Sequence, residues 1–334
     1  MVYNAIIIDS ANLYYRLKKN SKLPVDIVKR LISFIDAAKT SHLAKGGAIY
    51  ILFDPLSYSD LGESKNFYHP FSERKKVLPD YKGDRVYSQS YLYAIELLRK
   101  YYLYRGDTYK LIYSDEYEAD DFCHPLMEKL RNENSGAPFK VALVSNDHDL
   151  CAYVTDASAD KGHVAHLINA GFENPFTSEE FERQYEFKPT YASVVMYKAL
   201  LGDQSDNITG AVFLKRAKFP GNVKILCRDY LQKIANEGTS LDECVSLFKK
   251  TTFREAQEKK DKDAFDELFL VLSLVSMKMP ALEKMHSNVR VVRSALEGKS
   301  LEPFVHSNPE NKTINDIAHK SIYGISFRER FGKV

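Results

Sequence analysis

The sequence predicts an α/β fold in which a central, mostly parallel β-sheet is flanked by helices. Short apolar runs recur along the first half of the chain, and such runs are typical of parallel strands buried on both faces. Segments with apolar residues at helical spacing lie between some of these runs. Acidic residues follow the runs, and open parallel sheets bind ligands beyond the carboxyl ends of their strands. The sequence therefore also predicts a site at that edge of the sheet.

The expected strands account for the alternation along the chain. They lie at residues 5–8, 48–53, 111–113, 140–144 and 163–168. Asp9 follows the first strand and Asp54 follows the second. A helix is expected at residues 25–45, and Gly46 and Gly47 are expected to end it, because glycine is favoured just beyond a helix.

Residues 56–108 are more polar and more aromatic than the segments around them. Cations interleaved with aromatic rings can hold phosphates and stack on bases without reading sequence. A surface loop is the simpler alternative, and residues 88–104 are expected to form an ordinary core helix through Leu92, Ile95 and Leu98. The candidate nucleic-acid contacts are Arg74, Lys75, Lys76, Tyr81, Lys82 and Arg85.

The densest group of acids lies in residues 114–150, beside segments that are otherwise built for a core. Its members are Glu118, Asp120, Asp121, Asp147 and Asp149. Carboxylates brought together would take up protons unless cations neutralised them, and oxygen ligands suit Mg²⁺ or Mn²⁺ better than zinc. The group therefore predicts a metal site. An acidic helix cap at Ser114 or Asp115 is the alternative, although capping uses only one or two acids.

The second half of the chain is expected to be mainly helical. Residues 177–180 fit a capping box, and a helix is expected at residues 191–201. A glycine-bounded turn follows, and it carries Asp203 and Asp206. Beyond it, the candidate contacts to a nucleic-acid backbone are Lys215, Arg216 and Lys218, with helices expected over residues 222–278.

Charge and cysteine content narrow the class of protein. The net charge is +2, so a site of nine acids would leave the rest of the chain at +11, which favours a polyanionic partner around an acidic pocket. The cysteines form no CxxC pair and are expected to be reduced thiols of a cytoplasmic protein, or of the host cytoplasm if the protein is viral. A zinc set of Cys123, His124, His148 and Cys151 is disfavoured by its spacing. No signal peptide or membrane span is expected.

The order of these motifs resembles the 5′ nuclease superfamily, which includes flap endonucleases, the 5′–3′ exonuclease domains of bacterial polymerases and phage RNase H. The motifs are IIIDSAN, ILFDP, YKGDR, EADD, SNDHD and GDQSDNITG, and they span about residues 5–210. The resemblance implies a PIN-like nuclease domain at residues 1–188, with a helical arch at about residues 56–108. It also implies a helical region at residues 189–334, with a helix–three-turn–helix element and C-terminal helices.

The resemblance also assigns roles to residues. The acids that match the family's first metal site are Asp9, Asp54, Glu118, Asp120 and Asp121. Those that match its second site are Asp147, Asp149, Asp203 and Asp206. Lys82 and Arg85 match the basic pair of the family's helical gateway, which contacts the scissile phosphate, and Tyr81 matches a nearby aromatic residue.

The resemblance implies a nuclease that uses two Mg²⁺ ions, with Mn²⁺ as a substitute, and cuts near the 5′ end of branched or nicked duplexes in DNA replication or repair. DNA and RNA–DNA hybrids are both open as substrates, as are endonuclease and exonuclease action. Replication proteins are candidate partners, and a monomer without membrane contact is expected. Two other classes stay open: a non-catalytic nucleic-acid-binding protein on the same fold, and a PIN-type single-strand ribonuclease.

Two departures from the family pattern affect these expectations. Family members usually carry a glycine hairpin after GDxSDN that binds duplex phosphates, often with K⁺, whereas this chain reads ITGAVFLKRAKFPG. The K⁺ site is therefore left open, and Lys215, Arg216 and Lys218 are candidate substitutes for the hairpin. Pro125 falls in the expected EADD helix, where an interior proline would remove a hydrogen bond and kink the helix.

Overall fold

The computed structural model describes most of the first two hundred residues and short segments beyond them. The described residues are 1–18, 24–54, 89–102, 105, 107–114, 117–135, 137–156, 162–168, 172–203, 208–209, 230–236, 238, 240, 243 and 289–292. The expected arch between residues 56 and 88, Asp206, the cations at 215–218 and most of the expected C-terminal helices lie outside this set. The predictions made for them are not addressed by the described residues.

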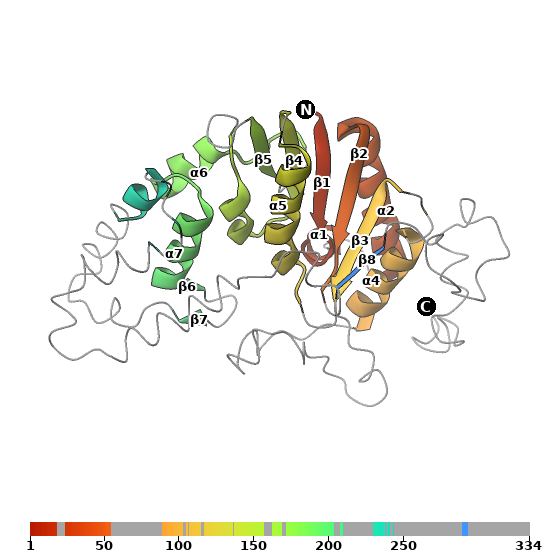
Figure 1. Cartoon of the computed structure of the whole chain (residues 1–334). Coiled ribbons are helices and arrows are strands. Elements are labelled where there is room, and N and C mark those ends of the chain that lie inside the picture. The colour runs from red at the N-terminus through yellow and green to blue at the C-terminus, as the bar shows by residue number, and fades with distance from the viewer. Residues whose placement is uncertain are drawn as a thin grey trace.

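A parallel sheet forms the centre of the molecule (Figure 1). Its parallel strands are β1 (Tyr3–Asp9), β2 (Leu43–Leu52), β3 (Tyr109–Ser114), β4 (Phe139–Val144) and β5 (His163–Ile168). The strand order is β5-β4-β1-β2-β3-β8, in which β8 (Val289–Val292) pairs antiparallel with β3 at the edge. The predicted α/β class and all five predicted strands are confirmed, whereas β8 was not predicted.

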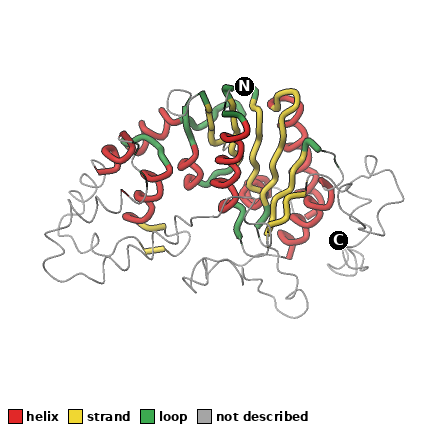
Figure 2. Tube along the Cα trace, in the orientation of Figure 1, coloured by secondary structure: helices red, strands yellow, loops and turns green. Residues whose placement is uncertain are grey.

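Helices cover both faces of the sheet (Figures 1 and 2). The α-helices are α1 (Ser10–Leu17), α2 (Pro24–His42), α4 (Gln89–Tyr102), α5 (Cys123–Glu133), α6 (Ser178–Tyr185) and α7 (Tyr191–Leu201). Two 3₁₀ helices, η2 (Asp120–Phe122) and η3 (His148–Tyr153), follow the acid-bearing ends of the sheet. A short antiparallel pair, β6 (Gly202–Asp203) and β7 (Ile208–Thr209), comes after α7.

The two faces of the sheet pack into separate cores because successive strand residues point to opposite sides. On one face, Ile6 and Ile8 pack with α1, α2 and α4. On the other, Ala5 and Ile7 pack with α5, η3, α6 and α7. Since β1 is apolar on both faces and fully covered, it lies in the middle of a three-layer α/β/α arrangement.

The helices confirm several predictions and explain one departure. Ile95 and Leu98 are fully buried, so α4 is a core helix as expected. Thr177 caps α6 by accepting a hydrogen bond from the Glu180 N–H, at 3.2 Å. Pro125 lies in the first turn of α5, because η2 precedes the helix. Its missing N–H therefore costs no helical hydrogen bond there, so the expected loss of a hydrogen bond was wrong.

Gly46 and Gly47 lie within β2. The expectation that they end the preceding helix was therefore wrong. The helix stops at His42, and the register between β1 and β2 shifts between Tyr3 and Ala5 opposite the glycines. Gly46 has a φ of +80°, and a Cβ added to Gly47 would lie 2.5 Å from the Asn4 carbonyl oxygen. The two glycines therefore allow a β-bulge, because Gly46 adopts the left-handed conformation and Gly47 permits the close backbone approach.

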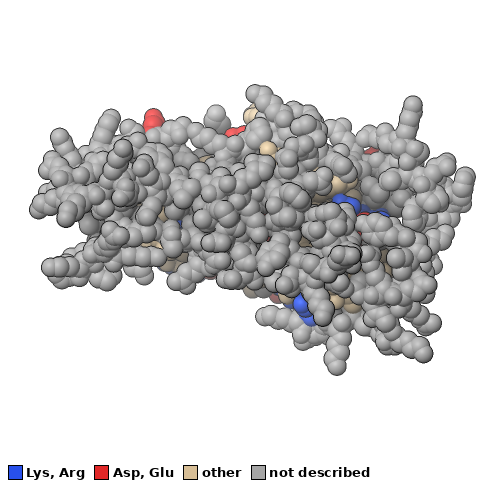
Figure 3. Space-filling view, turned by 90° about the horizontal axis from the view of Figure 1, so that it is seen from below, with Lys and Arg blue, Asp and Glu red and all other residues tan. Residues whose placement is uncertain are grey.

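The strand order places a topological switch point between β1 and β4. From β1 the chain continues to β2 and β3 on one side, and then returns to β4 and β5 on the other. In open parallel sheets, ligands bind at such a point, outside the carboxyl ends of the strands. That end of β1 faces downward in Figure 1, where α1 begins. Viewed from below, described Lys and Arg side chains reach the surface in separate places (Figure 3).

None of the described helices has both the length and the hydropathy that a membrane crossing requires.

Candidate metal centre

Asp9 occupies the carboxyl end of β1 and caps α1. Its Oδ1 accepts a hydrogen bond from the Asn12 N–H at 3.0 Å, and its Oδ2 accepts one from the Ser145 hydroxyl at 3.2 Å. Ser145 follows β4 directly and is almost fully buried. The carboxylate of Asp9 therefore bridges the ends of the two strands on either side of the switch point.

Asp54 links the end of β2 to the acidic segment after β3. Its Oδ1 accepts a hydrogen bond from the Ala119 N–H at 2.9 Å, and the Tyr91 hydroxyl of α4 lies 3.5 Å from its Oδ2. Asp121 closes the same segment on itself, because its Oδ2 accepts the Glu118 N–H at 2.9 Å. Backbone amides thus orient these carboxylates before any ligand binds.

The burial of the acids after β3 is unusual for charged residues. Glu118 is 1% exposed and Asp121 is 6% exposed, whereas Asp120 is half-buried at the start of η2. Ionised side chains are almost never fully buried unless they are paired or bind a metal. The segment therefore buries acids at the carboxyl edge of the sheet, where the other strands are also followed by acids.

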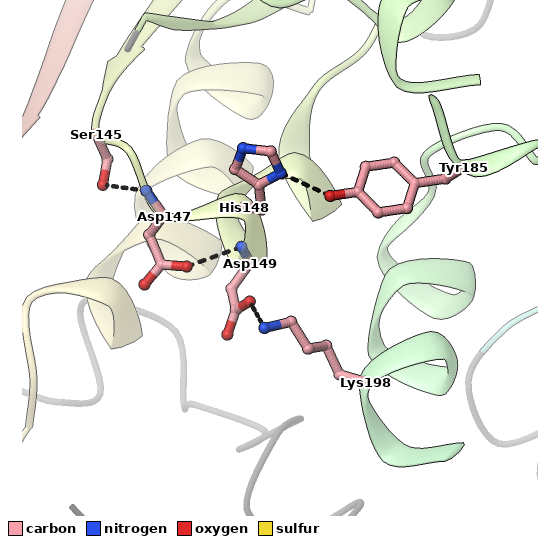
Figure 4. Close-up of polar contacts among 6 residues, drawn as sticks. All are labelled: Ser145, Asp147, His148, Asp149, Tyr185 and Lys198. Carbon is pink, nitrogen blue, oxygen red and sulfur yellow. Dashed lines mark hydrogen bonds and ion pairs between the residues drawn. The ribbon is translucent and has the colours of Figure 1, made fainter. Parts of the chain in front are cut away.

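Asp147 and Asp149 lie on the turn after β4, where Asp147 caps η3 and Asp149 belongs to the first turn of η3 (Figure 4). The Asp147 N–H donates to the Ser145 Oγ at 3.1 Å, and the Asp149 N–H donates to the Asp147 Oδ1 at 2.9 Å. The Asp149 carboxylate forms an ion pair with Lys198 of α7. A continuous chain of contacts therefore runs from Asp9 through this turn to α7.

The electrostatics show that acids from all the neighbouring strand ends act on Asp9. Burial is the largest cause, and together with the negative charges of Asp54, Asp147 and Asp120 it raises the pKa of Asp9 to about 7. The backbone hydrogen bond from Asn12 lowers the pKa and only partly opposes this effect. Like charges this close favour either a proton or a cation at the site.

The donor set fits a hard divalent cation in its chemistry, since all the gathered side chains are carboxylates. Among the described residues, however, no three His, Cys, Asp or Glu side chains are close enough to surround one ion. Asp203 is described only in its backbone, as part of β6, and Asp206 lies outside the described residues. Metal ligation by the nine acids therefore stays a prediction.

The alternative zinc set does not form among the described residues. Cys123 and Cys151 are fully buried in the apolar core. His124 lies 3.4 Å from Glu128 and stacks on Tyr191. The ring of His148 is hydrogen-bonded to Tyr185, so the two histidines have separate partners and the two thiols lie in the core.

A small cavity adjoins the acids between η2, η3 and α7. Its volume is about 50 Å³, which is room for a few water molecules. Asp120, Asp149 and Lys198 provide its charged lining, while Tyr153 and Tyr191 provide aromatic lining. The cavity therefore gives the acidic site a neighbouring space with both a cation and apolar walls.

The structure adds residues that the sequence analysis did not select. Asn12 and Ser145 orient Asp9 and the following turn, and the Asn12 Oδ1 accepts the Asn146 N–H at 2.7 Å. Tyr91 and Lys198 approach Asp54 and Asp149 from α4 and α7. The placement of residue 12 three positions after Asp9 is a local capping signal for its backbone N–H, but it does not mark the asparagine side chain. The other contacts join distant segments, and no sequence pattern marks them.

This chain is similar in sequence to two DNA polymerases. No protein-family model matches it. It is 24% identical over 251 residues to DNA polymerase I of Caldicellulosiruptor bescii, which covers 71% of this chain and 25% of that protein. It is 31% identical over 145 residues to DNA polymerase I of Bacillus caldotenax, which covers 41% of this chain and 14% of that protein. The chain thus matches only a quarter or less of the length of these relatives.

Solved structures show the same fold. A variant of the D15 flap endonuclease of bacteriophage T5, in complex with DNA and metal ions, matches with a TM-score of 0.52 and 19% identity. The T5 D15 protein crystallised with metal ions matches with a TM-score of 0.50 and 20% identity. Each match covers 82% of this chain and 89% of the T5 chain. The predicted resemblance is confirmed at the level of the fold.

Proposed function

We propose that this chain, which has the PIN-like fold of the 5′ nucleases, is a divalent-metal-dependent nuclease that cuts branched or nicked duplex DNA near a 5′ end. One observation carries the proposal. Acids that follow three other strands act on Asp9 at the switch point of the sheet, and burial together with their charges raises its pKa to about 7. A cluster of carboxylates can bind the divalent cations that assist phosphodiester hydrolysis.

The nine acids divide into two groups, and each group would hold one metal ion. Asp9, Asp54, Glu118, Asp120 and Asp121 would hold one Mg²⁺, with Mn²⁺ as a substitute, and Asp147, Asp149, Asp203 and Asp206 would hold the second. When bound, the ions would supply an activated water and offset negative charge on the phosphate and the leaving oxygen. The carboxylates would act as ligands, and the N–H groups of Asn12, Ala119 and Glu118 keep three of them oriented.

The positively charged part of the proposal concerns residues outside the described set. Lys82 and Arg85 would contact the scissile phosphate and stabilise its developing charge, with Tyr81 beside them. Lys215, Arg216 and Lys218 would contact the duplex backbone. Arg74, Lys75 and Lys76 would add contacts to the strand. The roles proposed for these cations depend only on the order of motifs in the sequence.

The relatives support nucleic acid as the substrate class. The T5 flap endonuclease variant was crystallised with DNA and metal ions, and the sequence relatives are DNA polymerases. A role in DNA replication or repair follows as the finer part of the proposal, with RNA–DNA hybrid as a second substrate. The same fold could also serve a binding protein without catalysis, and the test below separates the two.

Cleavage of labelled substrates by the purified full chain tests the proposal. A 5′-flap duplex, a nicked duplex and a plain RNA single strand would be incubated with Mg²⁺, with Mn²⁺ and with EDTA. We expect cleavage of the flap and nicked duplexes near the 5′ end with either metal and none with EDTA. The positions of the labelled products distinguish endonuclease from exonuclease action.

The variants Asp120→Ala and Asp203→Ala provide the matched comparison. Each should abolish cleavage while leaving flap binding in Ca²⁺ or EDTA within a few-fold of the parent chain, since the acids act on the reaction more than on the duplex. Full cleavage by either variant would contradict the proposed centre. Binding without any cleavage by the parent chain would favour the non-catalytic alternative, and cleavage of the RNA strand alone would favour a PIN-type ribonuclease.

A further inference from the structure

His148 lies between two of the proposed metal ligands, yet its side chain points away from them. Figure 4 shows its ring directed toward α6, while Asp147 and Asp149 point to the other side of the turn. The His148 Nδ1 and the Tyr185 Oη are 2.6 Å apart, which is a short hydrogen bond. This contact joins the turn after β4 to the last residue of α6.

Tyr185 is a well-fixed anchor for this hydrogen bond. Its ring stacks on Phe181 with centroids 4.4 Å apart and an interplanar angle of 26°, and it meets the edge of Tyr197 at 5.5 Å. Phe181 and Phe187 beside it are almost fully buried. Burial also raises the pKa of the Tyr185 hydroxyl, so the group stays protonated and able to donate. The position of the hydroxyl is therefore set by core packing.

The other described attachments of the turn differ in kind. Backbone amides of the turn donate to the Asn12 side chain, which comes from α1, and to the Ser145 hydroxyl, which follows β4. On the side of α7, Lys198 contacts the Asp149 carboxylate itself, where a bound cation would also have to act. The His148–Tyr185 hydrogen bond involves neither carboxylate. It can therefore hold the turn in the same place with and without a cation.

We propose that Tyr185 and His148 are positioning residues for the second half of the metal centre. Their hydrogen bond holds the turn so that the carboxylates of Asp147 and Asp149 stay on the side away from Tyr185, where a cation would bind (Figure 4). This inference rests on the proposed function, because it assigns the two acids to a metal. Partners of this kind, which orient a ligand without touching the ion, typically change metal affinity or activity by about 10-fold to 100-fold when removed.

Titration of the metal-free full chain with Mn²⁺, followed by the electron paramagnetic resonance signal of free Mn²⁺, tests the inference without substrate. Tyr185→Phe removes the hydroxyl and keeps the ring that stacks on Phe181. We expect this variant to bind the weaker of the Mn²⁺ ions about 10-fold less tightly. The Mg²⁺ concentration for half-maximal flap cleavage should rise by a similar factor, with a smaller change in the rate at saturating Mg²⁺.

Tyr197→Phe is the matched control, because it removes a hydroxyl from the same aromatic cluster but not the one that contacts His148. It should leave the Mn²⁺ titration unchanged. In a double-mutant cycle, His148→Ala should weaken Mn²⁺ binding in the parent chain and add little in the Tyr185→Phe chain.

The outcomes separate the two proposals. If the parent chain binds Mn²⁺ and cleaves the flap while Tyr185→Phe titrates like it, the positioning role is overturned and the proposed function stands. Equal weakening by Tyr185→Phe and Tyr197→Phe also overturns the positioning role, because the effect then belongs to packing. A parent chain that neither binds Mn²⁺ nor cleaves overturns the proposed function and this inference with it.

Discussion

At the scale of single residues, Asp9 shows most clearly how burial and charge act on the site. It is the residue on which burial and three neighbouring acids act together, and its pKa rises to about 7 from 3.8. Hydrogen bonds from Asn12 and Ser145 oppose the repulsion without cancelling it. Without a cation, the gathered acids therefore destabilise the folded state, and ionisation of Asp9 increases this destabilisation.

The stability of the metal-free protein should consequently fall as the pH rises. Between pH 3.8 and about 7 the folded state keeps the Asp9 proton that the unfolded chain releases, so the folded state binds more protons. Its stability decreases through this window and levels off above about pH 7. Thermal unfolding in EDTA should show this decrease for the parent chain and a smaller one for Asp9→Asn, which cannot ionise.

Two results would count against that account. A lower unfolding temperature for Asp9→Asn than for the parent at about pH 8 would mean that the carboxylate stabilises the metal-free fold. The same pH dependence in both chains would assign the effect to other groups.

At the scale of elements, the turn after β4 and helix α7 form a coupled pair. Lys198 is 19% exposed and Asp149 is 31% exposed in their ion pair, so the pair is partly shielded from water. Its strength should lie between that of an exposed pair and that of a buried one. The helix therefore brings a cation to the acids, in addition to packing against η3.

Lys198→Met should destabilise the metal-free chain by about 1 to 2 kcal/mol, because it leaves Asp149 without this partner's charge in a partly buried place. Urea unfolding in EDTA measures the change. Lys129→Met is the control, since its pair with Glu133 spans 3.2 Å on the exposed side of α5 and should matter by less than about 0.5 kcal/mol. Equal effects of the two substitutions would contradict the coupling of α7 to the turn.

The bulge in β2 gives a second prediction at this scale. A Cβ at position 47 would lie 2.5 Å from the Asn4 carbonyl oxygen and 3.0 Å from the Ala44 carbonyl oxygen, and both atoms belong to the backbone. Gly47→Ala should therefore destabilise the protein by about 1 to 3 kcal/mol in urea unfolding, since the strands must shift.

Gly46→Asn is the comparison for this substitution. Position 46 has open space around it, and asparagine tolerates the left-handed conformation that φ of +80° requires. This variant should lose less stability than Gly47→Ala. The reverse order would show that conformation, and not close approach, is what the bulge demands.

At the scale of the whole molecule, the acids join segments that are far apart along the chain. Asp9, Asp54, Glu118 and Asp147 come from four different strand ends, and only the strand order brings those ends together. A cation bound among them would link both sides of the switch point. Metal binding and folding should therefore be coupled.

Mg²⁺ should accordingly raise the unfolding temperature of the full chain. At about one hundred times its dissociation constant, a ligand that binds only the folded state contributes about 2.7 kcal/mol. Differential scanning calorimetry with added Mg²⁺ should show an increase that EDTA reverses, and NaCl of equal ionic strength should not reproduce it. An unchanged unfolding temperature with saturating Mg²⁺ would contradict cation binding at the acids.

The sequence by itself determined the five parallel strands of the sheet, most of the helix positions among the described residues and the presence of acids at the strand ends. These features are local, because apolar runs, helical spacing and capping residues act over a few neighbours. The same locality explains two errors. Gly46 and Gly47 were assigned to a helix end because a bulge depends on the neighbouring strand, and Pro125 was assigned to a helix interior because the preceding 3₁₀ turn was not foreseen.

Only the tertiary structure decided which side chains meet. The contacts of Asp9 with Ser145, of Asp149 with Lys198 and of His148 with Tyr185 join residues that are distant in the chain or belong to different elements. No spacing in the sequence encodes such pairs, because they depend on strand order and on how the helices pack over the sheet. The sequence therefore supplied the charged groups, and the fold set the distances and burial that raise the pKa of Asp9.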